Sequence, residues 1–339
     1  MVGDAYGWSV DDATLVSRDA VRTWTFRADV AGGDPVFLKL RAAADPARLA
    51  VCAWLAEHGL RGVVAPLRTI SGELSVVAAG LVVAAYPFID GTLAGDAHLT
   101  DAQWSAYGAI VSGVHRTSLP SELEAALPVE QFQPEPLARL AVLDTIVGDA
   151  ARRTHDVTAR ETVALWRAHR AEIEALATRT ALLAGTLRAR RPRDAGVLCH
   201  GDIHTYNVLI DRHAMLHVID WDDLIIAPPE RDLMFVLGSP IGGSRSEQDI
   251  KSFLEGYGSQ RIDPQRLAYY HVEWALQDVV GYAADALSEA SGSASRSVAL
   301  GILRGLFDPG GEVDIGLRAT PGLNGVRFQP AFSRPLEAS

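Results

Sequence analysis

The sequence predicts an α+β protein with two lobes: a small β-rich N-terminal lobe over residues 1–85 and a larger, mainly helical C-terminal lobe over residues 92–319. Three observations support this prediction. Short apolar runs separated by turn residues dominate the first quarter of the chain, helical periodicity dominates the rest, and Pro87 and Gly91 break the pattern between them. With 339 residues, 48% of them hydrophobic, the chain has ample material for a buried core.

The N-terminal lobe is expected to contain strands on both sides of one helix. The first two strands lie within residues 21–40, around a turn at residues 32–35. An alanine-rich helix then spans residues 46–58 and stops at Gly59. Three β-segments follow at residues 62–67, 74–77 and 81–85, and residues 86–91 form the connector between the lobes.

The C-terminal lobe is expected to be helical with one β-rich interruption. Thr100 and Asp101 are capping residues for a helix that reaches residue 116. Residues 122–150 are mixed, whereas residues 158–190, 247–256 and 264–290 have helical periodicity. Short apolar strands cover residues 197–199, 208–210 and 216–219, the last two as a hairpin. The tail over residues 320–339 has little periodicity and is expected to be an arm or a disordered segment.

Charge and cysteine content exclude several classes of protein. The net charge of −11 argues against a nucleic-acid-binding surface. Two cysteines, Cys52 and Cys199, are too few for a disulfide scaffold and suggest a reducing compartment. The N-terminus lacks the pattern of a signal peptide, and no apolar run approaches 18 residues. We therefore expect a cytoplasmic monomer with small-molecule partners and neither nucleic-acid nor membrane partners.

The basic residues are strongly biased towards arginine. Of 31 basic side chains, 29 are arginine, and the two lysines are Lys39 and Lys251. GC-rich coding explains most of this bias, but it makes a retained lysine informative. Lys39 ends an apolar strand, whereas Lys251 lies on an amphipathic helix and is expected at the surface.

A densely polar segment lies between the short strands of the helical lobe. Asp202 follows a strand and a glycine, Asn207 begins the next strand, and Asp220 ends the hairpin. A carboxylate and an amide oxygen held close together bind a hard divalent cation such as magnesium. A second carboxylate can accept a proton from a substrate hydroxyl. This combination of residues suits phosphoryl transfer.

Two other interpretations of this segment were weighed. His200, Asp202 and His204 have an alternating spacing that could chelate a transition metal, and the Gly-Asp-Ile-His string is typical of metallophosphoesterases. That class also needs later Gly-Asp-x-x-Asp and Gly-Asn-His-Glu motifs, which the chain lacks. The second interpretation is a set of polar loop residues that only satisfy turns.

The segment resembles a known catalytic signature. Residues 200–207 (HGDIHTYN), followed by residues 219–222 (IDWD), resemble that of the aminoglycoside phosphotransferases, which have a protein-kinase-like fold. Residues 197–235 are similar to the spectinomycin phosphotransferase branch in particular. Residues 85–89, 255–258 and 306–309 resemble the same branch.

The resemblance implies a role for each matching residue. Asp202 matches the catalytic aspartate that deprotonates the attacking hydroxyl, and Asn207 and Asp220 match the magnesium ligands. Lys39 matches the lysine that contacts the α- and β-phosphates of the nucleotide. The implied cofactors are ATP or GTP and Mg²⁺.

Four further residues gain expected roles from the resemblance. Tyr86 and Phe88 lie in the connector whose backbone binds adenine, and His200 and His204 belong to the structural framework of the catalytic loop. His200 is expected to hold the loop by hydrogen bonds.

The chain departs from the kinase pattern at two places. Kinases pair the lysine with a glutamate on the following helix, but positions 47 and 48 lack one, and Glu57 comes too late in that helix. Either another acid, such as Asp45, substitutes, or phosphate alone holds Lys39. Residues 17–25 contain no glycine, so Arg22 or Thr23 would contact the phosphates.

Acidic residues of the helical lobe are candidates to bind the amines of an acceptor. The candidates are Asp222, Asp223, Glu273, Trp274, Gln277 and Asp278. The alternative is that Trp274 belongs to the core and the acids are solvated. Glu230, Arg231 and Asp232 are expected to form a structural ion-pair cluster.

The sequence thus predicts a kinase that phosphorylates a hydroxyl of an aminocyclitol or aminoglycoside antibiotic such as spectinomycin, as a resistance enzyme. A kinase for another antibiotic or for a metabolite such as choline or homoserine remains an alternative. So does a nucleotide-binding pseudokinase.

Overall fold

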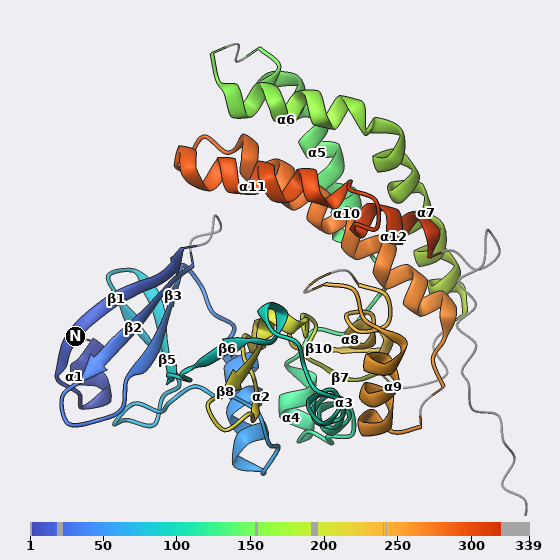
Figure 1. Ribbon diagram of the computed structural model, residues 1–339. Helices are drawn as coiled ribbons and strands as arrows, with labels where there is room; N and C mark the ends of the chain where they lie inside the picture. Colours follow the sequence, from blue (N-terminus) through green and yellow to red (C-terminus); the bar gives the residue numbers. More distant parts are fainter. Residues whose placement is uncertain are drawn as a thin grey trace, which may run out of the picture.

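The computed structural model describes residues 2–18, 23–152, 155–190, 196–239, 241, 243–259 and 261–319. Figure 1 shows two lobes, with an antiparallel sheet on the N-terminal side and a larger helical part on the C-terminal side. The predicted α+β class with two lobes is therefore confirmed. The expectation for the tail over residues 320–339 lies outside the described residues.

The N-terminal lobe is built on a five-stranded antiparallel sheet of order β1-β2-β3-β5-β4. Its strands are β1 (Val10–Arg18), β2 (Trp24–Val30), β3 (Val36–Arg41), β4 (Val76–Ala78) and β5 (Leu81–Pro87). A short helix, α1 (Val2–Tyr6), covers the sheet and contributes Tyr6 to a small core with Ala28, Leu38 and Ala85. Along β2, Thr25 and Ala28 are buried, Arg27 is exposed and the other residues are half-buried.

Two parts of this lobe differ from the sequence prediction. Strand β1 was not predicted because it lies at the sheet edge with exposed apolar residues, such as Leu15 and Val16, and shows no buried face. Residues 62–67, all described, form a loop with a single bridge from Val63 to Val218 and not the expected strand. Gly62 has a φ of +80° and Pro66 has no N–H, so the segment cannot continue a strand ladder.

Helix α2 (Pro46–Glu57) forms where it was expected. Asp45 caps it, because its side chain accepts a hydrogen bond from the N–H of Ala47 at 2.9 Å, and Pro46 suits the first helical turn. Its buried residues include Leu49, Cys52 and Leu55. The helix therefore faces the interior along one side and lies between the N-terminal sheet and the helical part of the chain (Figure 1).

The chain passes from one lobe to the other over a short distance. Strand β5 ends at Pro87, and β6 (Gly91–Leu93) joins a second sheet of order β6-β8-β9. Its other strands are β8 (Val208–Asp211) and β9 (Leu216–Val218). Strands β7 (Val197–Cys199) and β10 (Ile225–Ala227) pair beside it. These small sheets hold the polar segment identified in the sequence.

Most helices of the C-terminal lobe pack against one long helix, α10, whereas α3 and α9 pack against each other. The longer ones are α3 (Asp101–His115), α5 (Glu135–Ala150), α6 (Val157–Ala168), α7 (Arg170–Arg190), α9 (Glu247–Tyr257), α10 (Pro264–Leu287), α11 (Ser293–Leu306) and α12 (Glu312–Arg318); the short ones are α4 (Ser121–Ala125) and α8 (Glu230–Leu233). Single 3-10 turns are η1 (Ala94–Asp96), η2 (Thr205–Asn207) and η3 (Trp221–Asp223). Among the described helices, none is both long and apolar enough to cross a membrane.

Most helix predictions for this lobe are confirmed. Thr100 caps α3 with a full capping box to Gln103. Helices α9 and α10 lie within a few residues of their expected bounds, whereas α11 and α12 were not predicted, because glycine and serine in this region obscure their periodicity. Cys52 and Cys199 are free and buried. Lys251 is exposed, with its amine 3.8 Å from Glu255.

Candidate active site

The segment after β7 forms a tight loop that one buried carboxylate holds. Asp232, on α8, accepts hydrogen bonds from the backbone N–H groups of His200 and Gly201, each at 2.8 Å. Gly201 has a φ of +87°, and a Cβ there would lie 2.2 Å from the carbonyl oxygen of Asp223. Only glycine fits such a position. The backbone that precedes Asp202 is therefore fixed from two sides.

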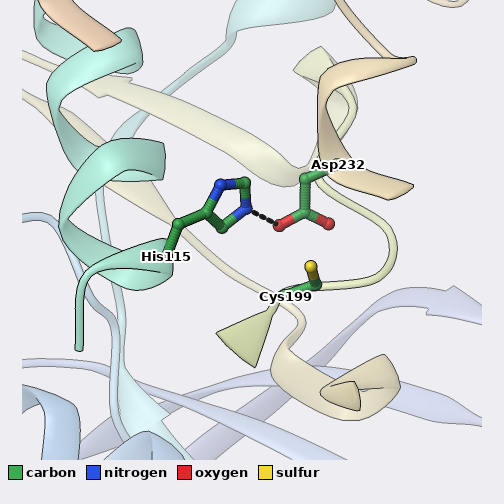
Figure 2. A group of neighbouring side chains, drawn as sticks. All are labelled: His115, Cys199 and Asp232. Carbon is green, nitrogen blue, oxygen red and sulfur yellow. Dashed lines mark hydrogen bonds and ion pairs between the residues drawn. The ribbon is translucent and has the colours of Figure 1, made fainter. Parts of the chain in front are cut away.

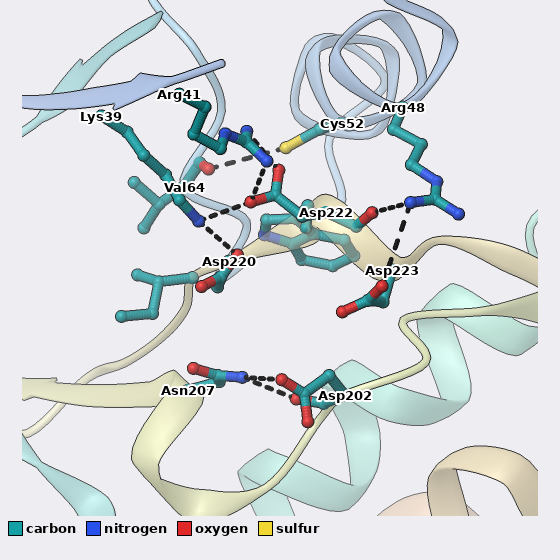
Figure 3. Close-up of polar contacts among 12 residues, drawn as sticks. Lys39, Arg41, Arg48, Cys52, Val64, Asp202, Asn207, Asp220, Asp222 and Asp223 are labelled. Carbon is teal, nitrogen blue, oxygen red and sulfur yellow. Dashed lines mark hydrogen bonds and ion pairs between the residues drawn. The ribbon is translucent and has the colours of Figure 1, made fainter. Parts of the chain in front are cut away.

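Asp202 and Asn207 face each other across this loop (Figure 3). The Asn207 Nδ2 donates to the Asp202 carboxylate Oδ2 at 3.0 Å and to the Asp202 carbonyl at 2.7 Å. The other carboxylate oxygen, Oδ1, is buried and accepts no hydrogen bond from the described residues, and the Nε2 of His204 lies 3.4 Å from it. The amide thus orients the carboxylate and leaves one of its oxygens for another partner.

Asp220 follows the hairpin in a strained backbone conformation. Its φ of 62° and ψ of 60° lie in the left-handed region, which is uncommon for a residue other than glycine. The next residue, Trp221, is buried against His200, and its indole N–H donates to the carbonyl of Val218 at 2.9 Å. Such strain persists only where the surroundings fix it, and it is concentrated at functional sites.

Three carboxylates gather at this end of the hairpin. Burial raises the pKa of Asp202 well above its ordinary value, and the charges of Asp223 and Asp220 raise it further. Burial also raises the pKa of Asp220, to about 6, although Lys39 opposes this shift. Such a concentration of acids favours a bound cation. The oxygens of Asn207 and Asp220 are the hard ligands that Mg²⁺ prefers, so these residues fit that ion.

Lys39 reaches this cluster from the opposite lobe. Its Nζ lies 2.6 Å from Asp220 Oδ1 and 2.5 Å from Asp222 Oδ2 (Figure 3). Burial opposes the charge of Lys39, but the two aspartates raise its pKa above the ordinary value. Strand β3 presents Lys39 and Arg41 on the same face, and Arg41 makes a two-pronged contact with Asp222 at 2.6 Å.

Of the two alternatives left open by the sequence, the structure agrees with the first, because other acids do replace the missing glutamate, but Asp45 is not one of them. Asp45 caps α2 and lies 3.6 Å from Arg48, and Glu57 pairs with Arg68 at 2.7 Å. Neither acid contacts Lys39 in the structure. The partners are instead Asp220 and Asp222, which follow the hairpin of β8 and β9 and are far from Lys39 in the sequence.

The two neighbouring acids Asp222 and Asp223 lie away from the other acceptor candidates. Burial alone would raise the pKa of Asp222, but the charge of Lys39 and that of Arg41 lower it to about 2. Arg48 donates to the Asp222 carbonyl and lies 3.9 Å from Asp223. Asp222 is thus bound by side chains of the N-terminal lobe, whereas the Asp223 side chain remains 59% exposed.

The structure describes only part of the predicted nucleotide contacts in the connector and before β2. The N–H of Phe88 donates to the carbonyl of Pro35 at 3.3 Å. Tyr86 pairs in register with Phe37 on β3, and its ring is half-buried. Thr23 lies directly before β2 and is also half-buried. Arg22 lies outside the described residues.

His200 is buried and His204 is half-buried, and both are linked to the site. The His200 Nε2 lies 3.0 Å from the Ile219 carbonyl, and its Nδ1 accepts from the N–H of Asp202 at 3.3 Å. These contacts agree with the expected role of His200 in holding the loop. Burial lowers the pKa of His204 to about 4, so this ring is neutral near pH 7. Its ring packs edge-on to Phe235.

The acceptor candidates on α10 differ in their surroundings. Glu273 is buried and pairs with Arg231 at 3.2 Å, so its carboxylate is not available in this arrangement. The Trp274 ring packs edge-on to Phe235 at 4.8 Å, which links α10 through Phe235 to His204 of the loop. The Trp274 indole N–H is buried and has no hydrogen-bond partner within the described chain.

Sequence reasoning missed one acid near these residues. Glu312, at the start of α12, hydrogen-bonds to the carboxyl of Asp278 and lines a small pocket with Trp274. Burial, with the charge of Glu273, raises the pKa of Asp278 to about 6, although the hydrogen bond with Glu312 opposes this shift. Burial, with the charge of Asp278, raises the pKa of Glu312 to about 10. No basic side chain contributes to either shift. Gln277 is half-buried on the same helix.

A second group of chemically active side chains lies behind the loop. His115, Cys199 and Asp232 approach one another closely enough to hold a metal ion (Figure 2). The two ring nitrogens of His115 already contact Asp232 at 3.0 Å and the Tyr257 hydroxyl at 2.8 Å. Burial raises the pKa of the Cys199 thiol well above its ordinary value. The group is a hydrogen-bonded support for the loop. Of the expected ion-pair cluster at residues 230–232, Asp232 pairs with His115, Arg231 with Glu273 and Glu230 with Arg266.

The chain was compared with known proteins. The model of the phosphotransferase enzyme family matches residues 20–270. Protein StrN of Streptomyces griseus is 27% identical over 270 residues, which cover 77% of this chain and 76% of StrN.

Solved structures are similar over both lobes. Spectinomycin phosphotransferase APH(9)-Ia, solved with ADP and spectinomycin, is 26% identical with a TM-score of 0.81, and the match covers 94% of this chain and 96% of that one. The amicoumacin kinase hAmiN, solved with AMP-PNP, Ca²⁺ and Ami, is 17% identical with a TM-score of 0.57. The match covers 89% of this chain and 90% of that one. At that identity the second match shows the fold alone.

Proposed function

Because the chain belongs to the phosphotransferase enzyme family, we propose that it transfers the γ-phosphate of ATP or GTP to a hydroxyl of an aminocyclitol antibiotic such as spectinomycin. The observation that carries this proposal is the convergence of Asp202, Asn207, Asp220 and Lys39 between the lobes. Residues 1–85 then form the nucleotide-binding lobe, residues 86–91 the connector, and residues 92–319 the lobe with the catalytic loop and the acceptor site.

Asp202 acts as the base in this proposal. Its Oδ2 is oriented by Asn207 and its Oδ1 makes no hydrogen bond within the described residues, so Oδ1 can accept the proton of the acceptor hydroxyl. The hydroxyl oxygen then attacks the γ-phosphate, and the nucleoside diphosphate leaves. Positioning and charge neutralisation carry most of the catalysis in such a reaction.

Phosphate charge is handled by the residues around Asp220. Lys39 donates to the α- and β-phosphates, and Thr23, directly before β2, is a further candidate contact. Asn207 and Asp220 hold Mg²⁺, which when bound neutralises charge on the phosphates. The pseudokinase alternative arose from two departures in the sequence, the missing glutamate partner of Lys39 and the absence of glycine from residues 17–25. Lys39 has two acid partners in the structure, which weakens that alternative.

The acceptor site lies along α10. Two buried carboxyls in contact, Asp278 and Glu312, cannot both ionise without a cation beside them. A protonated amine of an aminocyclitol supplies that cation, and Trp274 and Gln277 lie on the same helix to contact the sugar-like ring. Phe235 connects this region to His204 of the catalytic loop. This arrangement supports a cationic acceptor over a neutral one.

One experiment tests the proposal directly. Purified protein is incubated with Mg²⁺ and ATP or GTP and a panel of aminocyclitols, aminoglycosides, choline and homoserine, and products are read by mass spectrometry. We expect a mass gain of one phosphate on spectinomycin and none with Asp202→Ala. Phosphorylation of choline or homoserine alone would support the metabolite-kinase alternative. If no acceptor is phosphorylated, the proposal of an antibiotic kinase is wrong.

A further inference from the structure

The lysine of the nucleotide site is held by an acid of the other lobe. We propose that Asp222 is the positioning residue for Lys39, in place of the glutamate that kinases carry on the helix after this lysine. This inference rests on the proposed kinase function, because it assumes that Lys39 binds nucleotide phosphate. It assigns Asp222 a different role from that of an acceptor contact.

The contacts of Asp222 with the N-terminal lobe involve every polar atom of its side chain. Oδ2 lies 2.5 Å from Lys39 Nζ, and both carboxylate oxygens contact the Arg41 guanidinium at 2.6 Å. Arg48 donates to the backbone carbonyl of Asp222. The side chains of Lys39 and Asp222 are only 10% and 22% exposed. A carboxylate engaged in this way orients its partners and has no free oxygen for an acceptor amine.

Helix α2 cannot supply the acid, since its charges are the reverse of the kinase pattern. Its side facing the cluster includes Cys52, whose thiol donates to the carbonyl of Val64 and whose pKa is raised by burial and by the charge of Asp222. One turn earlier the helix carries Arg48, a cation, where a kinase has an acid. The one glutamate of α2, Glu57, pairs with Arg68 at the far end. The acids that pair with Lys39 therefore come from the facing lobe and not from α2 (Figure 3).

The two acids of Lys39 have separate duties in the proposed reaction. Asp220 is a proposed metal ligand, so a metal–nucleotide complex would compete with Lys39 for this carboxylate. Asp222 is not a proposed metal ligand, so it remains paired with Lys39 when Asp220 binds the metal. Because the Arg41 fork fixes Asp222, the lysine keeps a defined direction while its amine donates to phosphate.

A double-mutant cycle tests whether Asp222 acts through Lys39. Binding of MgADP to the full chain is measured by titration calorimetry for the wild type, Lys39→Met, Asp222→Asn and the double variant. We expect Asp222→Asn to weaken binding about tenfold in the wild-type background and by less than about twofold in the Lys39→Met background, since contacting charged residues couple strongly. A merely structural role would give the same loss in both backgrounds.

Two further variants control for charge and for folding. Glu57→Gln removes an acid from α2 that does not contact Lys39, and we expect wild-type affinity for MgADP. Asp222→Glu retains the carboxylate and should recover part of the lost affinity. With spectinomycin as the acceptor probe, Asp222→Asn should raise the KM for nucleotide and leave that for spectinomycin unchanged.

The outcomes separate this inference from the proposed function. If the wild type binds MgADP and Lys39→Met weakens binding while Asp222→Asn does not, the positioning role is wrong and the kinase proposal survives. Equal losses from Asp222→Asn in both backgrounds, or a raised KM for spectinomycin alone, also overturn the positioning role. A wild type that binds neither MgADP nor MgATP overturns both.

Discussion

The carboxylate of Asp232 accepts a hydrogen bond from the N–H of Gly201 at 2.8 Å, so a residue buried in the helical lobe determines the backbone that presents Asp202. The same carboxylate contacts His115 at 3.0 Å on α3. Burial would raise the pKa of Asp232, but its hydrogen bonds and the charge of His115 outweigh burial and lower it. The catalytic loop therefore depends on a charge that never reaches solvent.

Removal of that charge is expected to destabilise the whole domain. Asp232→Ala leaves His115 and two backbone N–H groups without their acceptor, and breaking a buried pair of this kind costs about 3–5 kcal/mol. Chemical denaturation followed by circular dichroism measures the loss. Asp29→Asn is the matched control, because the Asp29–Arg27 pair is about half exposed and should contribute less than about 1 kcal/mol. Equal losses for the two variants would contradict the role of Asp232.

The close approach of Gly201 to Asp223 predicts a sharp effect on activity. Gly201→Ala places a Cβ against the Asp223 carbonyl at a positive φ, so Asp202 must move. A displacement of about 1 Å can lower kcat by about a hundredfold. Gly185→Ala on α7, where a Cβ would meet nothing within 4 Å, is the control and should not lower kcat. Steady-state kinetics decide, and unaltered kcat for Gly201→Ala would show that the loop adapts.

The base and the lysine are expected to fail in different ways. Asp202→Ala should lower kcat by at least about a hundredfold and change the Kd for MgADP less than about twofold, because general bases contribute at this scale. Lys39→Arg keeps the positive charge but not the compact ammonium, and should raise the KM for nucleotide. Nucleotide binding and steady-state rates measure both. A loss of nucleotide affinity in Asp202→Ala would place that residue among the nucleotide contacts instead.

The Asp278–Glu312 pair predicts a pH-dependent stability. The folded pKa values, about 6 and about 10, lie above the ordinary values of 3.8 and 4.5. The folded chain therefore holds more protons than the unfolded chain between those limits, and stability falls as pH rises through them. Glu312→Gln removes most of this dependence.

We expect Glu312→Gln to raise the Tm at pH 9 by at least about 2 °C and to leave it nearly unchanged at pH 4. Differential scanning fluorimetry across this pH range measures the difference. Glu255→Gln, an exposed acid beside Lys251, is the control and should not alter the pH profile. A Tm difference that does not vary with pH would mean that the two carboxyls do not share a proton.

The catalytic loop could be predicted because its residues are close together in the sequence. Asp202, Asn207 and Asp220 lie within one loop and one hairpin, and the residue types at this spacing are rare by chance. The lobes were predictable for a similar reason, since strand and helix periods are local. Strand β1 was not, because an exposed edge strand has no apolar face to detect.

The parts of the site that the sequence could not predict join distant segments. Lys39 and Asp222 are 183 residues apart, and their pairing depends on how the lobes meet. Glu312 reaches Asp278 only because α12 packs on α10. The engagement of the Phe88 N–H with Pro35 depends on the register between β3 and β5. The sequence shows that α2 carries a basic residue, Arg48, where kinases have an acid. Only the structure shows that Arg48 contacts Asp222 and Asp223 of the facing lobe.

The position of Asp222 has a consequence for inhibition. Kinases pair this lysine with an acid on the following helix, so displacement of that helix separates the pair. Here that helix carries no acid for Lys39, so displacement of α2 alone leaves Lys39 paired with Asp220 and Asp222. A compound that wedges the lobes apart would instead break both pairs at once. The interface between the lobes, and not the helix, is the place to target.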